Sequence, residues 1–154
     1  MDSESNLESG HEHGHRPVST QRRLCLAAAG LILSRPTLAA TGDGAGFIAA
    51  AFAERDRAIA AGDRPYGAVV VLDGEIVGRG PSRVILDRDP TAHAEMQAIR
   101  DACRHLGRAD LSACILYASS RPCPMCEMAA YWAGVARFHY GAEGVDGGRP
   151  TYCR

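Results

Sequence analysis

The spacing of apolar residues changes repeatedly along the body of the chain, between a helical repeat and short strand-like runs. Residues 46–61 have helical spacing, and Gly62 directly after them is a common helix stop. Two apolar runs, over 66–72 and 75–80, flank Asp73-Gly74, a dipeptide typical of a two-residue hairpin. The sequence therefore predicts a helix followed by two antiparallel strands.

The alternation of helices and strands continues through the second half of the chain. We expect, in order, a helix capped by Asp89-Pro90-Thr91 that runs to about His105 and stops at Gly107, a strand over 111–118, a helix over 122–133 and a strand over 135–140. Because strands alternate with helices, the predicted fold class is α/β, arranged as a layered sandwich. Residues 141–154 are rich in Gly and too short for another useful helix.

Composition allows one folded domain and excludes several classes of protein. The 154 residues are 46% hydrophobic and 23% charged, which excludes a collagen-like or wholly disordered chain. The 17 basic residues, all of them Arg, nearly balance 18 acidic ones, so a strongly basic protein that coats nucleic acid is disfavoured. A chain of this length does not need disulfides, and two of its six Cys are spaced like metal ligands, so we predict no disulfide framework.

The first forty residues differ in kind from the rest. Residues 1–17 are polar, and we expect a disordered leader in which three alternating His have no assigned role: His11, His13 and His15. Arg22-Arg23, an apolar run over 24–33 that is too short to span a bilayer, and Pro36 resemble a bacterial twin-arginine signal. We therefore predict a leader with an export signal over 1–40, a folded domain over 41–154 and a periplasmic location. The alternative is a cytosolic amphipathic extension on a cytoplasmic protein.

The strongest chemical signal is a pair of motifs at the starts of two predicted helices, His93-Ala94-Glu95 and Pro122-Cys123-Pro124-Met125-Cys126. Together they satisfy the pattern H-x-E…P-C-x-x-C. A catalytic zinc ion takes three protein ligands and keeps a fourth position for water, and one imidazole with two thiolates fills that quota. We therefore predict Zn²⁺ as the cofactor, with three ligands: His93, Cys123 and Cys126.

Glu95 is the candidate catalytic residue beside this metal. Zinc lowers the pKa of a bound water toward about 7, and Glu95 would take the proton from the water and later protonate the leaving amine. For the C-x-x-C motif alone, a redox dithiol and half of a structural zinc site are the alternatives. Cys103 and Cys114 are interpreted as small core residues, and Cys153 is left without a role.

These motifs, together with Asp89-Pro90-Thr91-Ala92 before them and Tyr131-Trp132-Ala133 after, resemble the cytidine and deoxycytidylate deaminase superfamily, and within it the bacterial guanine deaminases. The resemblance covers about residues 46–143, including Pro65-Tyr66-Gly67-Ala68. It implies a three-layer α/β/α sandwich with a central sheet of four to five strands. It also implies one zinc ion per subunit, a homodimer, and hydrolytic deamination of a nucleobase or nucleoside, with guanine to xanthine first.

The resemblance also suggests where the substrate binds. The candidate substrate contacts are Tyr66, Ala68, Ser82 and Ala94. Ser82 stands where guanine and tRNA adenosine deaminases carry an Asn that hydrogen-bonds the base, and Arg121 stands where the family usually has Glu. The sequence ends at Arg154, before the segments that close over the substrate in guanine deaminases. We therefore expect a more open pocket or a lid from another subunit.

Two other functions remain open on the sequence. A tRNA adenosine-to-inosine deaminase is disfavoured by the near-neutral charge and by the absence of a basic C-terminal helix, so a nucleic-acid partner is not expected. A non-catalytic zinc module is disfavoured because Glu95 is retained beside the metal motif. Besides a place in the substrate pocket, Tyr66 and Trp132 are equally consistent with a core or dimer-contact position. No stable membrane anchor is expected.

Overall fold

The computed structural model describes residues 44–152. The predicted leader, the export signal and the domain boundary after residue 40 lie outside this range, as does Cys153. Within it, no helix combines the length and the apolar character needed to cross a bilayer.

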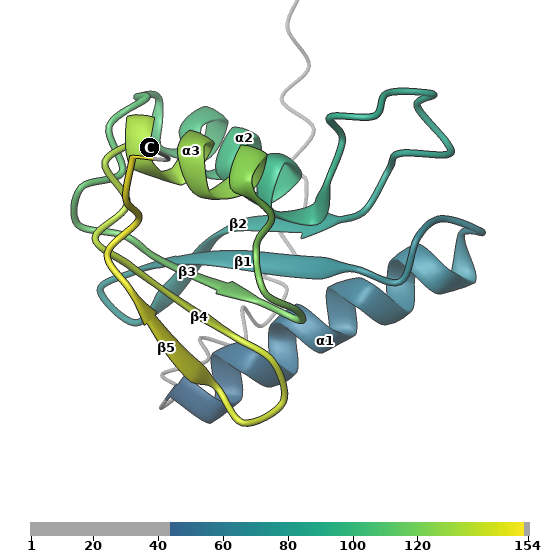
Figure 1. The fold of residues 1–154 in the computed structure, drawn as a ribbon, viewed down its shortest axis with the longest axis horizontal. Coiled ribbons are helices and arrows are strands. Elements are labelled where there is room, and N and C mark those ends of the chain that lie inside the picture. Colours follow the sequence, from purple (N-terminus) through teal and green to yellow (C-terminus); the bar gives the residue numbers. More distant parts are fainter. Residues whose placement is uncertain (1–43, 153–154) are drawn as a thin grey trace, which may run out of the picture. The chain divides into compact units, whose positions relative to one another are not determined.

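Three helices and five strands make up this region. In chain order they are α1 (Gly44–Ala60), β1 (Gly67–Leu72), β2 (Glu75–Pro81), α2 (Ala94–Leu106), β3 (Ile115–Ala118), α3 (Pro124–Trp132), β4 (Arg137–Tyr140) and β5 (Val145–Gly148). The strands form one sheet in the order β2-β1-β3-β4-β5, in which only β3 and β4 run parallel. Helix α1 covers one face, and α2 and α3 cover the other (Figure 1). The predicted three-layer α/β/α sandwich is confirmed.

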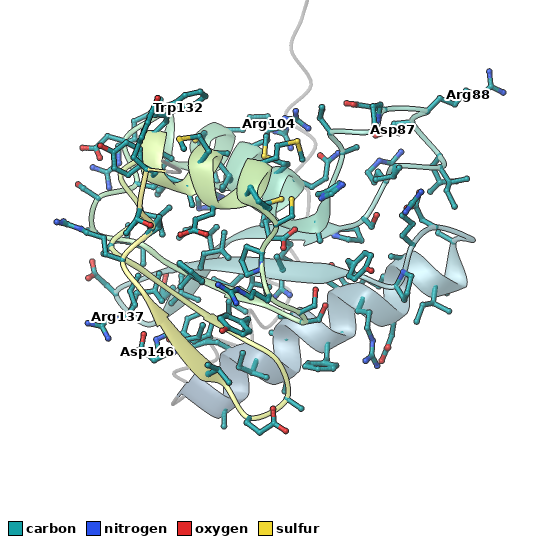
Figure 2. All side chains as sticks on the ribbon, in the orientation of Figure 1. Asp87, Arg88, Arg104, Trp132, Arg137 and Asp146 are labelled. Carbon is teal, nitrogen blue, oxygen red and sulfur yellow. The ribbon has the colours of Figure 1, made fainter. Side chains whose placement is uncertain are left out.

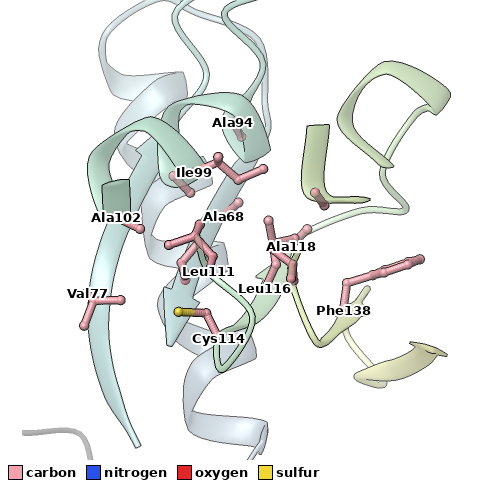
Figure 3. Close-up of a cluster of buried hydrophobic side chains, with 14 residues drawn as sticks. Ala68, Val77, Ala94, Ile99, Ala102, Leu111, Cys114, Leu116, Ala118 and Phe138 are labelled. Atoms are coloured by element: carbon pink, nitrogen blue, oxygen red, sulfur yellow. The ribbon is translucent and has the colours of Figure 1, made fainter. Parts of the chain in front are cut away.

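Each face of the sheet has its own apolar core. On the α1 side, Phe47 and Ile48 meet alternate residues of the central strands, which are Val69, Val71 and Tyr117. On the other side a larger cluster joins the intervening strand residues to small side chains of α2 (Figure 3). The alternation of β1 residues between the two cores is what a strand buried on both faces requires.

The first hairpin forms as predicted. Asp73 and Gly74 both have positive φ, at 50° and 79°, as a two-residue type I′ turn requires. Gly62, at φ 79°, lies just beyond α1 and confirms the predicted stop.

The structure corrects the start of α2. The helix begins at Ala94, with His93 as its N-cap residue and no side-chain capping bond. The predicted cap over Asp89-Pro90-Thr91 was wrong, because the Asp89 carboxylate instead accepts hydrogen bonds from the backbone N–H and the hydroxyl of Thr91, both at 2.7 Å. These hydrogen bonds lie within the loop that precedes α2, so Asp89 does not cap the helix.

The later strands are shorter than predicted, and one was not predicted. Strand β3 begins at Ile115, because Leu111 accepts a hydrogen bond from the backbone of Cys114 and closes a turn before the strand. Strand β4 likewise begins only at Arg137. Strand β5 forms in the Gly-rich tail by antiparallel pairing with β4, and Arg137 forms an ion pair with Asp146 across the two strands (Figure 2).

Two glycines of β2 allow α2 to lie directly on the sheet. A Cβ atom on Gly80 would come within 2.1 Å of the Ala94 carbonyl oxygen, and one on Gly78 within 2.4 Å of the Ala98 carbonyl oxygen. The helix backbone therefore occupies the space that side chains would take. This contact fixes the start of α2, where the predicted catalytic and metal residues lie.

Candidate active site

The three predicted metal ligands meet where the N-terminal ends of α2 and α3 converge. His93 is the N-cap residue of α2, Cys123 is the N-cap residue of α3, and Cys126 lies in the first turn of α3. The two sulfur atoms are 3.6 Å apart, and each is 3.6 Å from Nδ1 of His93. The two cysteines follow His93 by 30 and 33 residues in the sequence, yet the three donor atoms meet at one point.

These distances fit a tetrahedral zinc ion. With usual Zn–S and Zn–N bond lengths, tetrahedral ligands stand about 3.8 Å apart for two sulfurs and about 3.6 Å apart for sulfur and nitrogen. Among residues 44–152, no fourth His, Cys, Asp or Glu joins the group. The three donor atoms are therefore positioned to hold a zinc ion and would leave one of its four coordination positions open, as in catalytic zinc sites. Cys114 is buried in the core on the α2 side and Cys103 packs against it, as predicted.

In the absence of a cation, the surroundings of the Cys126 sulfur favour the neutral thiol. Burial raises the pKa of the Cys126 thiol, and so does its proximity to Glu95. A divalent cation reverses that preference, because zinc binds thiolate rather than thiol. The positive end of the α3 dipole, where both cysteines lie, also favours the thiolate form over the thiol.

Glu95 lies against the metal ligands without joining them. Its side chain is 6% exposed, and Oε2 lies 3.4 Å from Sγ of Cys126. Burial is the largest influence on this carboxyl and raises its pKa above the usual value. A carboxyl that holds a proton more readily than usual is suited to alternate between base and acid.

A pocket of about 430 Å³ opens beside these groups. This volume lies within the usual range for small-molecule sites. The pocket is lined by Arg64, Tyr66, His93, Glu95, Ser120, Arg121 and Cys123. Two of the metal ligands and the candidate catalytic carboxyl therefore face a space that a flat ring can enter.

Comparison with known proteins assigns the family. Residues 44–142 match the family described as the cytidine and deoxycytidylate deaminase zinc-binding region. The chain belongs to this family. It is 52% identical over 82 residues to a guanine deaminase of Bacillus subtilis (strain 168), covering 53% of each chain. It is 40% identical over 96 residues to a tRNA-specific adenosine deaminase of Aquifex aeolicus (strain VF5), covering 62% of this chain and 64% of the relative.

Solved structures of guanine deaminases share the fold. The Bacillus subtilis protein superposes with a TM-score of 0.64 at 44% identity, covering 66% of this chain and 65% of the other. The Nitrosomonas europaea protein gives 0.62 at 30% identity, covering 71% and 69%. This deaminase-family chain spans 53% and 64% of the length of the two curated relatives named above.

The predicted substrate contacts of this deaminase-family domain fall into two groups. Tyr66 is 44% exposed and lines the pocket. Ala68 and Ala94 are fully buried in the core on the α2 side, and Ser82 is 1% exposed. The Ser82 hydroxyl donates a 2.8 Å hydrogen bond to Oδ1 of Asp63, so it is already engaged within the protein. Contact of these four residues with a substrate stays a prediction.

Sequence reasoning missed Asp63, which organises the loop beside the pocket. Its carboxylate, 8% exposed, accepts four hydrogen bonds, from the Ser82 hydroxyl and from the backbone N–H groups of Arg64, Ile85 and Leu86. Burial alone would raise the pKa of Asp63, but these bonds outweigh it and lower the pKa. The sequence carries no sign of this role, because three of the four partners lie 19 to 23 residues away.

Proposed function

We propose that this domain is a hydrolytic deaminase of a nucleobase or nucleoside, with guanine, converted to xanthine, as the first candidate. The observation that carries the proposal is a buried carboxyl, Glu95, placed 3.4 Å from a metal-ligand sulfur at a pocket open to solvent. A structural zinc site needs no such group. The same placement argues against a non-catalytic zinc module.

In this reaction one C–N bond breaks and one C–O bond forms. When bound, zinc would lower the pKa of a water molecule, so that hydroxide is available to attack the carbon that carries the amine. Glu95 would take the proton that the water releases and pass it to a ring nitrogen of the base. It would then carry the proton of the added hydroxyl to the amine, which leaves as ammonia while the C=O bond forms. His93 and the two cysteines hold the metal, and Tyr66 offers an aromatic face to the base at the pocket wall.

Guanine is the first candidate substrate because several similar proteins are named guanine deaminases. The curated Bacillus subtilis protein at 52% identity and both solved structures described above are named guanine deaminases. The second candidate, deamination of adenosine in tRNA, is supported by the Aquifex aeolicus relative, whose name is tRNA-specific adenosine deaminase. The near-neutral charge of the chain argues against tRNA.

Ammonia release by the zinc-loaded full chain tests the proposal. The substrates are guanine, cytosine, adenosine and an anticodon stem-loop, each with the wild type and with Glu95→Gln. We expect guanine turnover that falls about 100-fold to 10,000-fold in Glu95→Gln, while bound zinc is unchanged. Turnover of the stem-loop alone would favour the second candidate. No turnover of any of the four, with zinc bound, would contradict deamination of these substrates.

We also propose that the domain works as an exported homodimer. The twin-arginine resemblance of Arg22-Arg23 supports export, because that route carries proteins already folded around a cofactor. Replacement of both arginines by Lys should then retain the protein in the cytoplasmic fraction. Dimerisation is supported by Trp132, which is 75% exposed at the end of α3 (Figure 2). Of the two positions considered for this residue, core or dimer contact, its exposure excludes the core.

A further inference from the structure

The pocket carries positive charge that the protein leaves unpaired. Arg64 and Arg121 line it and are exposed. Among residues 44–152, neither guanidinium forms an ion pair or a hydrogen bond, and the hydroxyl of Ser120, which also lines the pocket, has no partner either. Most other arginines of this region are paired with carboxylates: Arg55, Arg57, Arg79, Arg83, Arg104 and Arg137.

The residues that line the pocket make the two unpaired arginines more significant. The lining holds two guanidinium groups, those of Arg64 and Arg121, and one carboxyl, that of Glu95, within a chain whose net charge is −1. A neutral base gains little from that charge, whereas an anionic group on the substrate gains charge-assisted hydrogen bonds.

Both arginines are attached to fixed backbone. Arg64 follows Asp63, whose carboxylate accepts the Arg64 backbone N–H at 2.7 Å but is otherwise saturated by Ser82, Ile85 and Leu86. The Arg64 guanidinium is therefore not drawn to the neighbouring carboxylate.

Arg121 is fixed by a different part of the fold. It precedes Pro122, which restricts its backbone, and it lies two residues before the ligand Cys123. The guanidinium groups of Arg64 and Arg121 thus line the pocket from two different segments of the chain, one after α1 and one before α3.

We infer that Arg64 and Arg121 bind a phosphate group, and that the substrate is an aminated base that carries a phosphate ester. Guanidinium groups match phosphate oxygens with paired hydrogen bonds, and the Ser120 hydroxyl adds a donor. The base would lie toward Glu95 and the metal, and its phosphate at the two arginines. This inference rests on the proposed function for its reaction, the deamination of a base, and places the preferred substrate among phosphorylated nucleosides rather than free guanine. The phosphate can belong to a free nucleotide or to an RNA chain.

Steady-state kinetics of the zinc-loaded full chain test the inference. The substrates are guanine, guanosine, guanosine 5′-monophosphate and an adenosine-containing anticodon stem-loop, and the proteins are the wild type, Arg64→Gln, Arg121→Gln and Arg121→Lys. Arg108→Gln is the matched control, because Arg108 is also exposed and forms no ion pair with residues 44–152, but does not line the pocket.

We expect wild-type kcat/KM to be at least about 10-fold higher for the monophosphate than for guanosine, and each Gln variant to reduce this ratio about 10-fold. Arg121→Lys should restore part of the ratio, since Lys keeps the charge without the paired geometry. Arg108→Gln should leave the ratio unchanged. Equal kcat/KM for guanosine and its monophosphate would overturn the inference while leaving the proposed function in place. A preference for the stem-loop, lost in the same variants, would support phosphate binding and assign the phosphate to RNA.

A binding measurement separates the two proposals. Zinc-loaded Glu95→Gln is titrated with xanthosine and xanthosine 5′-monophosphate by calorimetry, so no turnover is needed. Tighter binding of the monophosphate, weakened about 10-fold by an added Arg64→Gln or Arg121→Gln change, supports the inference even if every deamination assay is negative. Equal affinity for both compounds overturns it.

Discussion

Asp63 is a charged residue that the protein satisfies without an ion pair. Three backbone N–H groups and one hydroxyl surround its carboxylate, and they belong to the loop that follows α1 and to the loop between β2 and α2. One side chain therefore holds together two loops that border the pocket. The negative charge is stabilised by dipoles, which leaves the neighbouring Arg64 guanidinium available.

Replacement of Asp63 by Asn should destabilise the domain in a pH-dependent way. An amide cannot accept all four bonds, so we expect Asp63→Asn to lower the free energy of unfolding by about 2 kcal/mol or more at pH 7. The pKa of Asp63 is lower in the folded protein than its usual value near 3.9. The stability that the carboxylate contributes is therefore present above that usual value and is lost as the pH falls through the folded-state pKa.

Urea unfolding of wild type and Asp63→Asn between pH 7 and pH 3 measures this effect. The difference between the two proteins should be constant near neutral pH and should shrink below about pH 4. Zinc affinity should fall on acidification in both proteins, because the ligands must be deprotonated, and the difference between the two proteins removes this shared contribution. A difference that stays the same down to pH 3 would contradict the assignment of the effect to the Asp63 charge.

Prediction from sequence succeeded where the spacing within a short motif carries the information. The grouping of His93, Cys123 and Cys126 was predicted because two short motifs contain the donor set of a catalytic zinc site, and the structure brings the three side chains together. Asp63 and Arg64 were not found, because their importance comes from partners and a pocket assembled by distant segments. An aspartate and an arginine in a loop after a helix do not by themselves indicate which distant residues they contact or which pocket they line.

At the scale of elements, the contact between β2 and α2 controls the geometry of the site. Gly78 and Gly80 face the α2 backbone so closely that no Cβ atom fits. The first turn of α2 carries Glu95 and adjoins His93. Close packing of helix and strand therefore determines where one metal ligand stands relative to the two cysteines of α3.

Gly80→Ala should weaken zinc binding. Its Cβ would come within 2.1 Å of the Ala94 carbonyl oxygen, so the first turn of α2 must move, at a cost of about 1 to 3 kcal/mol in stability. We expect the zinc Kd, measured by competition with a chromophoric chelator, to rise at least about tenfold.

Gly78→Ala is the matched control for this change. Its Cβ meets the Ala98 carbonyl oxygen, one turn further along α2. It should therefore cost similar stability with a smaller effect on zinc. Equal weakening of zinc binding by both variants would contradict a local effect at the start of α2.

The elements themselves were largely predictable, and the differences have physical causes. The hairpin at Asp73-Gly74 follows from the positive φ that its residues tolerate. Strand β5 was missed because Val145–Gly148 has weak strand propensity and is held by pairing with β4. The cap of α2 was misassigned because Asp89 has a nearer donor in Thr91 than the helix offers.

For the whole molecule, zinc joins segments that are distant in the sequence. His93 stands 30 residues before Cys123, with β3 between them. A metal that binds only the folded arrangement adds its binding free energy to folding stability. At free zinc about 1,000-fold above its Kd this contribution is about 4 kcal/mol.

Removal of zinc should therefore lower the melting temperature by roughly 10 °C or more. Thermal unfolding with and without a chelator measures the change. Cys123→Ser should abolish the zinc-dependent shift, while Cys103→Ser, which changes a half-buried cysteine outside the metal group, should retain it. A shift that persists in Cys123→Ser would show that zinc acts elsewhere.

The exposed aromatic residues at the end of α3 predict how copies associate. Trp132 is 75% exposed, and the neighbouring Tyr131 forms an edge contact with Tyr152 at 6.0 Å between ring centroids. Exposed Trp and Tyr are enriched at interface hot spots. If this surface forms the proposed homodimer, Trp132→Ser should weaken dimerisation at least about tenfold, measured by light scattering over a dilution series. Ile85→Ser, at another exposed apolar site, should leave the mass unchanged.

The residues that line the pocket differ in burial, and this bears on how such a domain can diverge. Glu95 is buried, whereas Arg64 and Arg121 are exposed. Substitution of an exposed lining residue leaves the packed core unchanged, so it can change which compound binds with little loss of folding stability. Descendants of one gene can therefore acquire new substrates through a few surface changes while the inherited reaction stays intact.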